Sequence, residues 1–180
     1  MAFVFVSGRP SLDFVGTLKW RDDRPEEQLD SPATLASWLC LAGVTGADVP
    51  VSTARFAQAV QIREAVYRAV RARMARRRIA ADDVAILNAA ARRRVAAPVL
   101  AADGRVTRSV TVDAALAVLA RDAIDLIGGA EFDRVRRCAN TRCTRLYVDA
   151  SRGRTRRWCG MAECGNAAKV AAFRARQRSS

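Results

Sequence analysis

Four of the five cysteines in this 180-residue chain lie in its last quarter, in two pairs of identical spacing. Four residues separate Cys138 from Cys143 and Cys159 from Cys164, and fifteen residues lie between the two pairs. Two close cysteine pairs joined by an insert of hairpin length are typical of a tetrahedral structural zinc site. The chain contains no histidine, so a zinc site must be built from cysteine, alone or together with a carboxylate. A soft four-thiolate set favours zinc or iron–sulfur over harder metals, and we predict Zn²⁺.

Two disulfides, four unrelated core cysteines and an iron–sulfur cluster are the alternatives. Disulfides suit a secreted protein, but residues 1–6 are too short for a signal peptide and lack a cleavage site. Scattered core cysteines would not fall into two equal pairs within so short a stretch. Sparse, clustered cysteine fits a reducing compartment, so we expect a cytoplasmic protein.

The excess positive charge lies almost entirely beside these cysteines. The formal net charge is +13; residues 134–180 hold 13 Lys and Arg against Asp149 and Glu163, a net of +11. Charge of this density attracts polyanions, and we expect nucleic acid as the partner. A solvated basic tail and an anionic membrane are alternatives. Membrane binding requires large apolar anchors, whereas residues 165–178 offer mainly alanine with Val170 and Phe173, so we expect no membrane contact.

Three segments of this region carry a family resemblance. They are Trp-Cys-Gly-Met at 158–161, Cys-Gly-Asn at 164–166 with Lys169 after it, and Asp149-x-Ser151, which leads into the predicted hairpin. These residues resemble the CGNR zinc finger, which is found at the C-terminus of bacterial proteins described as stress-induced transcription regulators. The naming motif of that family ends in arginine, where this chain has Ala167.

A second resemblance lies near the start of the chain. Leu-Asp-Phe-Val-x-Thr-Leu at 12–18 and Leu-x-x-Trp-Leu-x-x-Ala-Gly at 35–43 are similar to the N-terminal domain that accompanies the CGNR finger. The resemblance implies a small polar site, a candidate ligand-sensing pocket, on Arg9, Asp13, Thr17 and Trp38. The family commonly has asparagine where this chain has Gly16. Alternatively, Asp13 and Thr17 hydrogen-bond neighbouring backbone, as short polar side chains commonly do.

The pattern predicts a mainly α fold with a small β-hairpin: a helical regulatory domain over 1–132 and a treble-clef-like, CGNR-like zinc finger over 133–180. Helices are predicted at 11–20 with Ser11 as cap, at 32–43, 53–78 and 82–95, and at 114–128 with Asp113 as cap. In the fourth helix Val84, Leu87 and Ala91 are expected to face inward. A hairpin is predicted around Asp103-Gly104. The run 76–78 indicates a solvated helix end, with an accessory phosphate contact as the alternative.

In the finger, residues 146–148 and 155–158 are predicted to pair as a hairpin, followed by a helix at 165–178. Tyr147, Trp158 and Phe173 are expected to form an apolar cap over the metal. Guanidinium groups bind phosphates and can read guanine edges, so the basic residues of the hairpin and helix are candidate nucleic-acid contacts. These residues are Arg152, Arg154, Arg156, Arg157, Lys169, Arg174, Arg176 and Arg178.

These features predict a zinc-dependent, DNA-binding transcription regulator and no enzyme. Catalysis that depends on histidine is excluded, and no phosphate-binding loop or dinucleotide fingerprint is present. A zinc-stabilised module that binds RNA or a protein is the main alternative; a carboxylate enzyme with Asp13 in a deep pocket is a third. A homo-oligomer is compatible with the sequence, and no effector is indicated. Because the finger is too small to fold unaided, we expect Cys159→Ser to unfold it and to spare the helical body.

Overall fold

The computed structural model describes residues 3–95, 97–107 and 110–178. Its helices are α1 (Pro10–Val15), α2 (Pro32–Leu41), α3 (Thr53–Met74), α4 (Ala81–Ala91), α5 (Val112–Gly128) and α6 (Asn166–Arg178), with a 3-10 turn η1 (Ala130–Arg134) and a π-helical turn η2 (Met161–Gly165). Three antiparallel two-stranded ladders pair β1 (Leu18–Lys19) with β2 (Glu26–Glu27), β3 (Val99–Leu100) with β4 (Val106–Thr107), and β5 (Val135–Arg137) with β6 (Leu146–Val148). The chain is mainly α-helical, as the sequence predicts.

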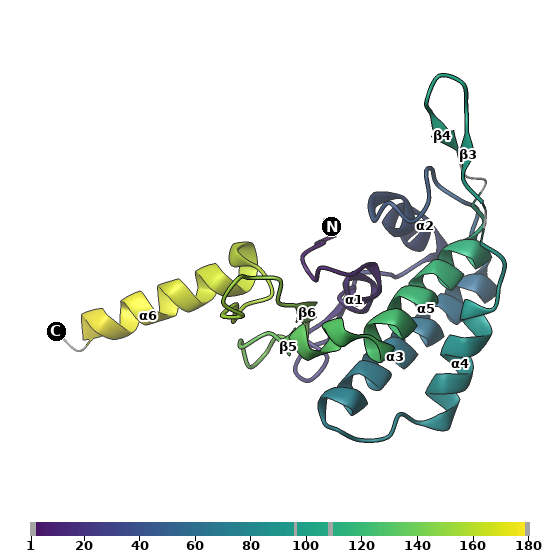
Figure 1. Ribbon diagram of the computed structural model, residues 1–180. Helices are drawn as coiled ribbons and strands as arrows, with labels where there is room; N and C mark the ends of the chain where they lie inside the picture. Colours follow the sequence, from purple (N-terminus) through teal and green to yellow (C-terminus); the bar gives the residue numbers. More distant parts are fainter. Residues whose placement is uncertain (1–2, 96, 108–109, 179–180) are drawn as a thin grey trace.

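Helices α3, α4 and α5 lie side by side, and α1 packs against α3 and α5 (Figure 1). The core between them is made of small and branched apolar side chains, and α5 contributes most to it because nearly every face of that helix is buried. Helix α6 points away from this body, and the β3–β4 hairpin projects from it at the opposite end (Figure 1). No helix in the described part of the chain is long and apolar enough to cross a membrane.

Two of the predicted elements are confirmed closely. Helix α2 begins after Ser31, whose hydroxyl accepts the Thr34 N–H while the Thr34 hydroxyl accepts the Ser31 N–H, a reciprocal cap. The hairpin around Asp103-Gly104 forms with Val99 opposite Thr107, and Gly104 adopts a φ of 82°, a conformation that glycine takes without steric cost.

The first helix is shorter than predicted, and Ser11 is not its cap. Helix α1 already includes Pro10, which the prediction placed just before the helix. Arg9 is the N-cap residue, and its side chain makes no capping hydrogen bond. The helix ends at Val15, and the Thr17 hydroxyl then donates 2.7 Å to the Phe14 carbonyl oxygen. This competing hydrogen bond lets residues 18–19 leave the helical direction and form β1.

Further helix boundaries and facings also differ from prediction. Helix α3 ends at Met74 instead of Arg78, because Arg76 adopts a left-handed φ of 54°. On α4, Val84 is exposed and Asp83 is buried in its place, where it binds the guanidinium of Arg68. The cap of α5 is the Thr111 hydroxyl, which accepts the Ala114 N–H over 3.2 Å, and not Asp113.

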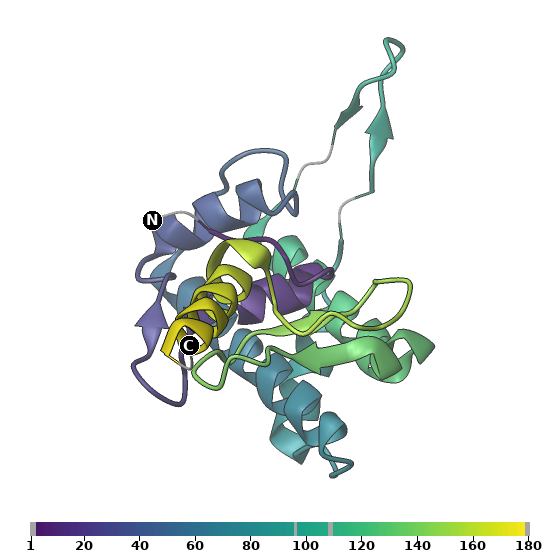
Figure 2. The same cartoon turned by 90° about the vertical axis from the view of Figure 1, so that its left-hand side faces the viewer.

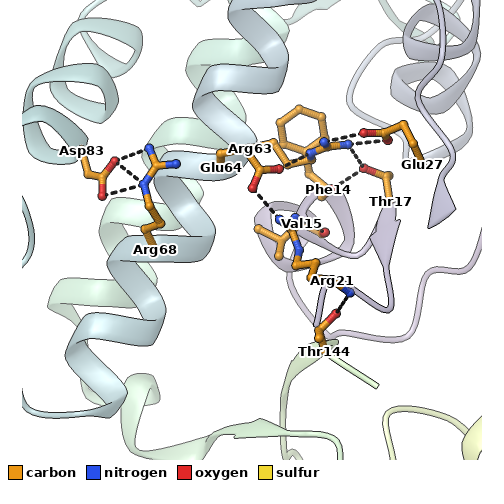
Figure 3. A network of polar contacts seen from close by, with 10 residues as sticks. All are labelled: Phe14, Val15, Thr17, Arg21, Glu27, Arg63, Glu64, Arg68, Asp83 and Thr144. Atoms are coloured by element: carbon orange, nitrogen blue, oxygen red, sulfur yellow. Dashed lines mark hydrogen bonds and ion pairs between the residues drawn. The ribbon is translucent and has the colours of Figure 1, made fainter. Parts of the chain in front are cut away.

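A charged network crosses the body where the sequence pattern predicts only an apolar stripe (Figure 3). Arg63 of α3 is 1 % exposed; its guanidinium binds both carboxylate oxygens of Glu27 at 2.6 Å and the Thr17 hydroxyl at 3.1 Å. Glu64 binds Arg63 and also Arg21. The network ties β2 and the segment after β1 to α3, which fixes the β1–β2 loop that reaches the cysteine region.

Candidate metal centre and nucleic-acid interface

The four clustered cysteines converge on one point. All four side chains are buried, and their Sγ atoms lie within 4.8 Å of one another. The Sγ atoms of Cys143 and Cys159 are 3.8 Å apart, and none of the described cysteines forms a disulfide. The disulfide alternative is therefore not what the structure shows.

The spacing of the sulfurs fits a single tetrahedral ion. Zn–S bonds of about 2.3 Å place the corners of a tetrahedron about 3.8 Å apart, which is the separation of Cys143 and Cys159. A multi-iron cluster inserts its own sulfides between the cysteines and needs a wider arrangement. The donor set is soft and contains no carboxylate or histidine, so zinc is the metal it fits.

Without a metal ion the four thiols cannot all ionise together. Hydrogen bonds with Cys143 and then Cys159 lower the pKa of Cys138 to about 2. The hydrogen bond to Cys138 raises the pKa of Cys143 to about 12, and burial raises the pKa of Cys164. One thiolate is thus stabilised by its neighbours, while further thiolates would repel it. A divalent ion removes that repulsion and allows all four thiols to lose their protons.

Two N–H groups donate hydrogen bonds to the cysteine sulfurs. The backbone N–H of Cys159 donates to Cys138 Sγ over 3.4 Å, and the Asn140 amide donates to Cys164 Sγ over 3.6 Å. Such N–H···S bonds orient the ligands and spread negative charge away from the sulfur. Asn140 was not singled out in the sequence; its place inside the first cysteine pair is the signal that could have found it.

Three aromatic side chains surround the cysteines, but they are not the three predicted. Tyr147 is fully buried among them, and Trp158 packs against the cluster, as expected. Phe173 does not belong to this cap, because it lies on α6 and is 54 % exposed. Its place is taken by Trp20, which comes from the β1–β2 loop of the helical body. Sequence reasoning missed Trp20 because more than a hundred residues separate it from the cysteines.

The strand pairing of the finger also differs from prediction. Residues 146–148 pair with 135–137, before the first cysteine, and not with 155–158. The segment 151–156 instead forms a loop held by buried Asp149, whose carboxylate accepts the N–H groups of Ser151 and Arg156 and the Ser151 hydroxyl. This bonding, the Ser151 hydroxyl first, lowers the pKa of Asp149. The loop is therefore shaped by one carboxylate rather than by a strand ladder.

Arg156 differs from the other candidate nucleic-acid residues. Its guanidinium donates to the carbonyl oxygens of Trp158 at 2.9 Å, Val6 at 2.8 Å and Cys159, and lies 4.3 Å over the Tyr147 ring. The Tyr147 hydroxyl in turn donates to the Arg156 carbonyl oxygen. These contacts brace the second cysteine pair and leave little of this guanidinium for an outside ligand.

The remaining candidates face solvent. Arg152, Arg154 and Arg157 of the loop are exposed, and so are Lys169, Arg174 and Arg176 on α6. The side chain of Arg178 lies outside the described part of the structure. Figure 2 looks toward α6 and shows the helix and the loop on different sides of the β5–β6 pair. The basic residues thus form two groups, one on the 152–157 loop and one on α6.

The helical body contributes directly to the finger. The β1–β2 loop places Asp22 against Arg137 and Asp23 against Arg142, each at 2.7 Å. Lys19 lies 3.4 Å from Glu163 of η2, and the Arg21 N–H donates to the Thr144 hydroxyl. Together with Trp20, these contacts make the loop a structural part of the metal centre.

The residues of the candidate ligand pocket are used in internal contacts. Asp13 accepts the N–H groups of Val6 and Ser7 at 3.0 and 2.9 Å; burial, opposed by these hydrogen bonds, raises its pKa. Arg9 pairs with Asp122 at 3.0 Å, and Trp38 packs on Phe14 in the core. Asp13 and Thr17 therefore hydrogen-bond neighbouring backbone groups, as in the alternative to a ligand pocket. A Cβ at Gly16 would come within 2.9 Å of Arg145 Nη1, so an asparagine there would displace that guanidinium.

A helical body joined to a four-cysteine centre defines a two-part protein with a zinc-finger module. Residues 8–130 match the family described as "Putative stress-induced transcription regulator", and residues 134–177 match the CGNR zinc finger. The chain belongs to this regulator family and carries the CGNR finger at its C-terminal side. A search of curated proteins found no match. Both matched families are regulator and zinc-finger types, not enzymes.

Proposed function

We propose that the protein is a DNA-binding transcription regulator in which Cys138, Cys143, Cys159 and Cys164 bind one Zn²⁺ and thereby fix a basic surface for DNA phosphates. The observation that supports it is that several basic residues of the finger have no carboxylate partner. Among the described residues, no ion pair involves Arg152, Arg154, Arg157, Lys169 or Arg174. By contrast, Arg137 and Arg142 are neutralised by Asp22 and Asp23.

The unpaired cations are placed where a duplex can reach them. They are exposed; the loop that carries Arg152, Arg154 and Arg157 ends at Cys159, and α6 begins two residues after Cys164. Metal binding at these cysteines would therefore anchor one end of each element. Guanidinium groups without a carboxylate partner bind phosphates through paired N–H donors. In this proposal Arg156 positions the loop through its backbone carbonyl contacts, while Arg152, Arg154 and Arg157 contact the nucleic acid.

A salt series with matched variants tests the proposal. Zinc-loaded protein should bind duplex DNA with an affinity that falls steeply with salt, by a log–log slope of about 0.9 for each phosphate contacted. Arg152→Gln/Arg154→Gln should lower the slope by about 2. Arg92→Gln/Arg94→Gln is the control, because it removes the same charge from exposed residues at the end of α4. An affinity that does not change with salt would refute DNA binding through phosphates.

RNA binding is the second candidate, and a groove beside the cysteines favours it. This groove has a volume of about 440 Å³ and is lined in part by Trp158, Arg157 and Met161. Arg157 lies 5.5 Å over the Trp158 ring, an arrangement on which an unpaired base can stack. Competition separates the two functions: single-stranded RNA should fail to displace duplex DNA from a DNA regulator and should displace it readily from an RNA-binding module.

A ligand-sensing or pairing role for the helical domain remains part of the proposal. Its support is the family match over residues 8–130, together with the direct contacts between the β1–β2 loop and the finger. A ligand that moves this loop would act on the metal centre without touching it.

A further inference from the structure

A second group of arginines surrounds an open cleft outside the finger loop. The cleft has a volume of about 620 Å³ and lies where the end of α3 meets η1 and β5. Its lining combines three guanidinium groups with an apolar floor and one carboxylate: Arg73, Arg76, Arg136, Met74, Phe132, Val135 and Asp133.

Two of these guanidinium groups are held in place by uncharged partners. Arg73 lies 4.5 Å over the ring of buried Phe132. Arg136 donates from Nη1 to the carbonyl oxygens of Asp133 at 2.7 Å and Val135 at 2.9 Å. Both cations are thus oriented without being neutralised, and the rotational freedom lost when they bind an anion is reduced.

The cleft carries three guanidinium groups against the single carboxylate of Asp133, so positive charge is in excess. Among the described residues, Arg73, Arg76 and Arg136 form no ion pair with a carboxylate, although thirteen such pairs are present elsewhere. The carbonyl end of α3 offsets part of the charge of Arg73 and Arg76. Arg136 comes from a strand, and its charge helps to lower the pKa of Asp149. Three cations around one cleft repel each other, and an anion between them relieves that repulsion.

The β5–β6 ladder connects the cleft to the basic loop of the finger. Arg136 lies opposite Tyr147 in the β5–β6 ladder, and the Tyr147 hydroxyl binds the backbone of Arg156. The Asp149 N–H donates to the Arg134 carbonyl oxygen over 2.8 Å, and the Asp149 carboxylate shapes the loop. One strand pair therefore separates the cleft from Arg152 and Arg154.

We propose that this cleft is a phosphate-binding site, with Arg73, Arg76 and Arg136 as its ligands. Its position beside the basic loop assigns it to the backbone of the same nucleic acid, and to that extent the inference rests on the proposed function. A free phosphorylated compound presents the same chemistry. The experiment below separates the two sources.

The first arm measures duplex DNA binding by the zinc-loaded chain across a salt series. Arg73→Gln/Arg76→Gln should reduce the log–log salt slope by about 2, and Arg92→Gln/Arg94→Gln should leave it unchanged. Because Arg73 packs on Phe132, Arg76→Gln alone serves as a second variant. The exposed Arg76 side chain has no polar partner among the described residues, so this change should reduce the slope by about 1.

The second arm titrates the same proteins with inorganic phosphate and follows the arginine side-chain N–H signals by NMR. Signals of Arg73 and Arg136 should shift in the parent and control proteins, and the Arg136 shift should be lost in Arg73→Gln/Arg76→Gln. A phosphate response without an effect on DNA assigns the cleft to a free phosphorylated compound. Absence of both responses overturns the site.

The two proposals fail in different ways. If Arg152→Gln/Arg154→Gln weakens DNA binding and the cleft variants change neither arm, the finger function stands and the cleft has no phosphate role. If the parent protein does not bind DNA at all, the proposed function fails, and the phosphate titration alone decides the cleft.

Discussion

The backbone N–H of Arg21 donates a hydrogen bond to the Thr144 hydroxyl over 3.3 Å, next in sequence to Cys143 (Figure 3). The side chain of the same arginine binds Glu64 of α3 and the Val15 carbonyl oxygen. One residue of the β1–β2 loop thus contacts the metal centre through its backbone and the body core through its side chain. The finger and the body are therefore joined by non-covalent contacts as well as by the polypeptide chain.

Trp20 is the residue whose removal should reveal this coupling. Trp20→Ala removes half-buried aromatic surface from the cysteine cluster and should destabilise the finger by about 1–3 kcal/mol. Zinc should transfer to a chromophoric chelator faster than from the parent protein. Leu41→Ala is the control, since Leu41 is 65 % exposed and distant in sequence from the loop. Equal zinc release in both variants would contradict a structural role for the loop.

Because of Glu64, the free energy of unfolding should fall as the pH is lowered into the acid range. Burial acts to raise its pKa, but Arg21 and then Arg63 outweigh burial, and the pKa is held below its ordinary value of 4.5. A lowered carboxyl pKa stabilises the fold above the unfolded value, and this stabilisation is lost as the pH falls through the folded value.

We therefore expect Glu64→Gln to lower the free energy of unfolding by about 1–3 kcal/mol at neutral pH, with the difference shrinking below pH 4.5. Denaturant titrations at neutral and acid pH measure it. Glu131→Gln is the matched control, because Glu131 forms only an exposed pair with Arg9. A Glu64→Gln penalty that persists unchanged in acid would contradict the assignment.

Substitution of Arg156 should affect the stability of the finger, whereas substitution of Arg154 should affect DNA binding. Arg156→Gln loses contacts to three carbonyl oxygens and to the Tyr147 ring, and should lower finger stability by about 1–3 kcal/mol. Arg154→Gln should leave stability unchanged and weaken DNA binding, because Arg154 is exposed and unpaired. Thermal unfolding and DNA binding measured on both variants decide the point. The reverse pattern would mean that the two roles are exchanged.

The elements that follow from local chemistry could be predicted from the sequence. The start of the second helix at Pro32, the Asp103-Gly104 turn and the paired cysteines each depend on residues only a few positions apart, so spacing alone indicates them. The same reasoning led to the four-cysteine centre, whose convergence the structure confirms.

The features that were missed depend on contacts between distant parts of the chain. The strand partner of residues 146–148 could not be chosen from sequence, because 135–137 and 155–158 are both short and rich in arginine. The contact of Trp20 with the cysteine cluster could not be predicted, because a hydrophobic pattern does not show which distant surface a loop covers. Arg63 lies within an apolar stripe, and only the three-dimensional position of Glu27 explains its burial.

Cys159→Ser tests whether the body survives without the finger. Three thiolates bind zinc less tightly, so we expect loss of metal and loss of amide protection over residues 138–166. The core of α1 to α5 contains none of the four cysteines and should remain folded with a lower melting temperature. Hydrogen exchange resolves the two regions. Complete unfolding of the body would show that the β1–β2 loop and the finger are required for the whole fold.

Metal analysis of the purified protein is the most direct test of the zinc centre. Native mass spectrometry should show one zinc ion per chain, with its loss in Cys159→Ser, and duplex DNA binding should disappear when the metal is removed and return when zinc is restored. A protein that is isolated with two disulfides, or that binds DNA equally well without metal, would contradict a zinc-held DNA-binding surface.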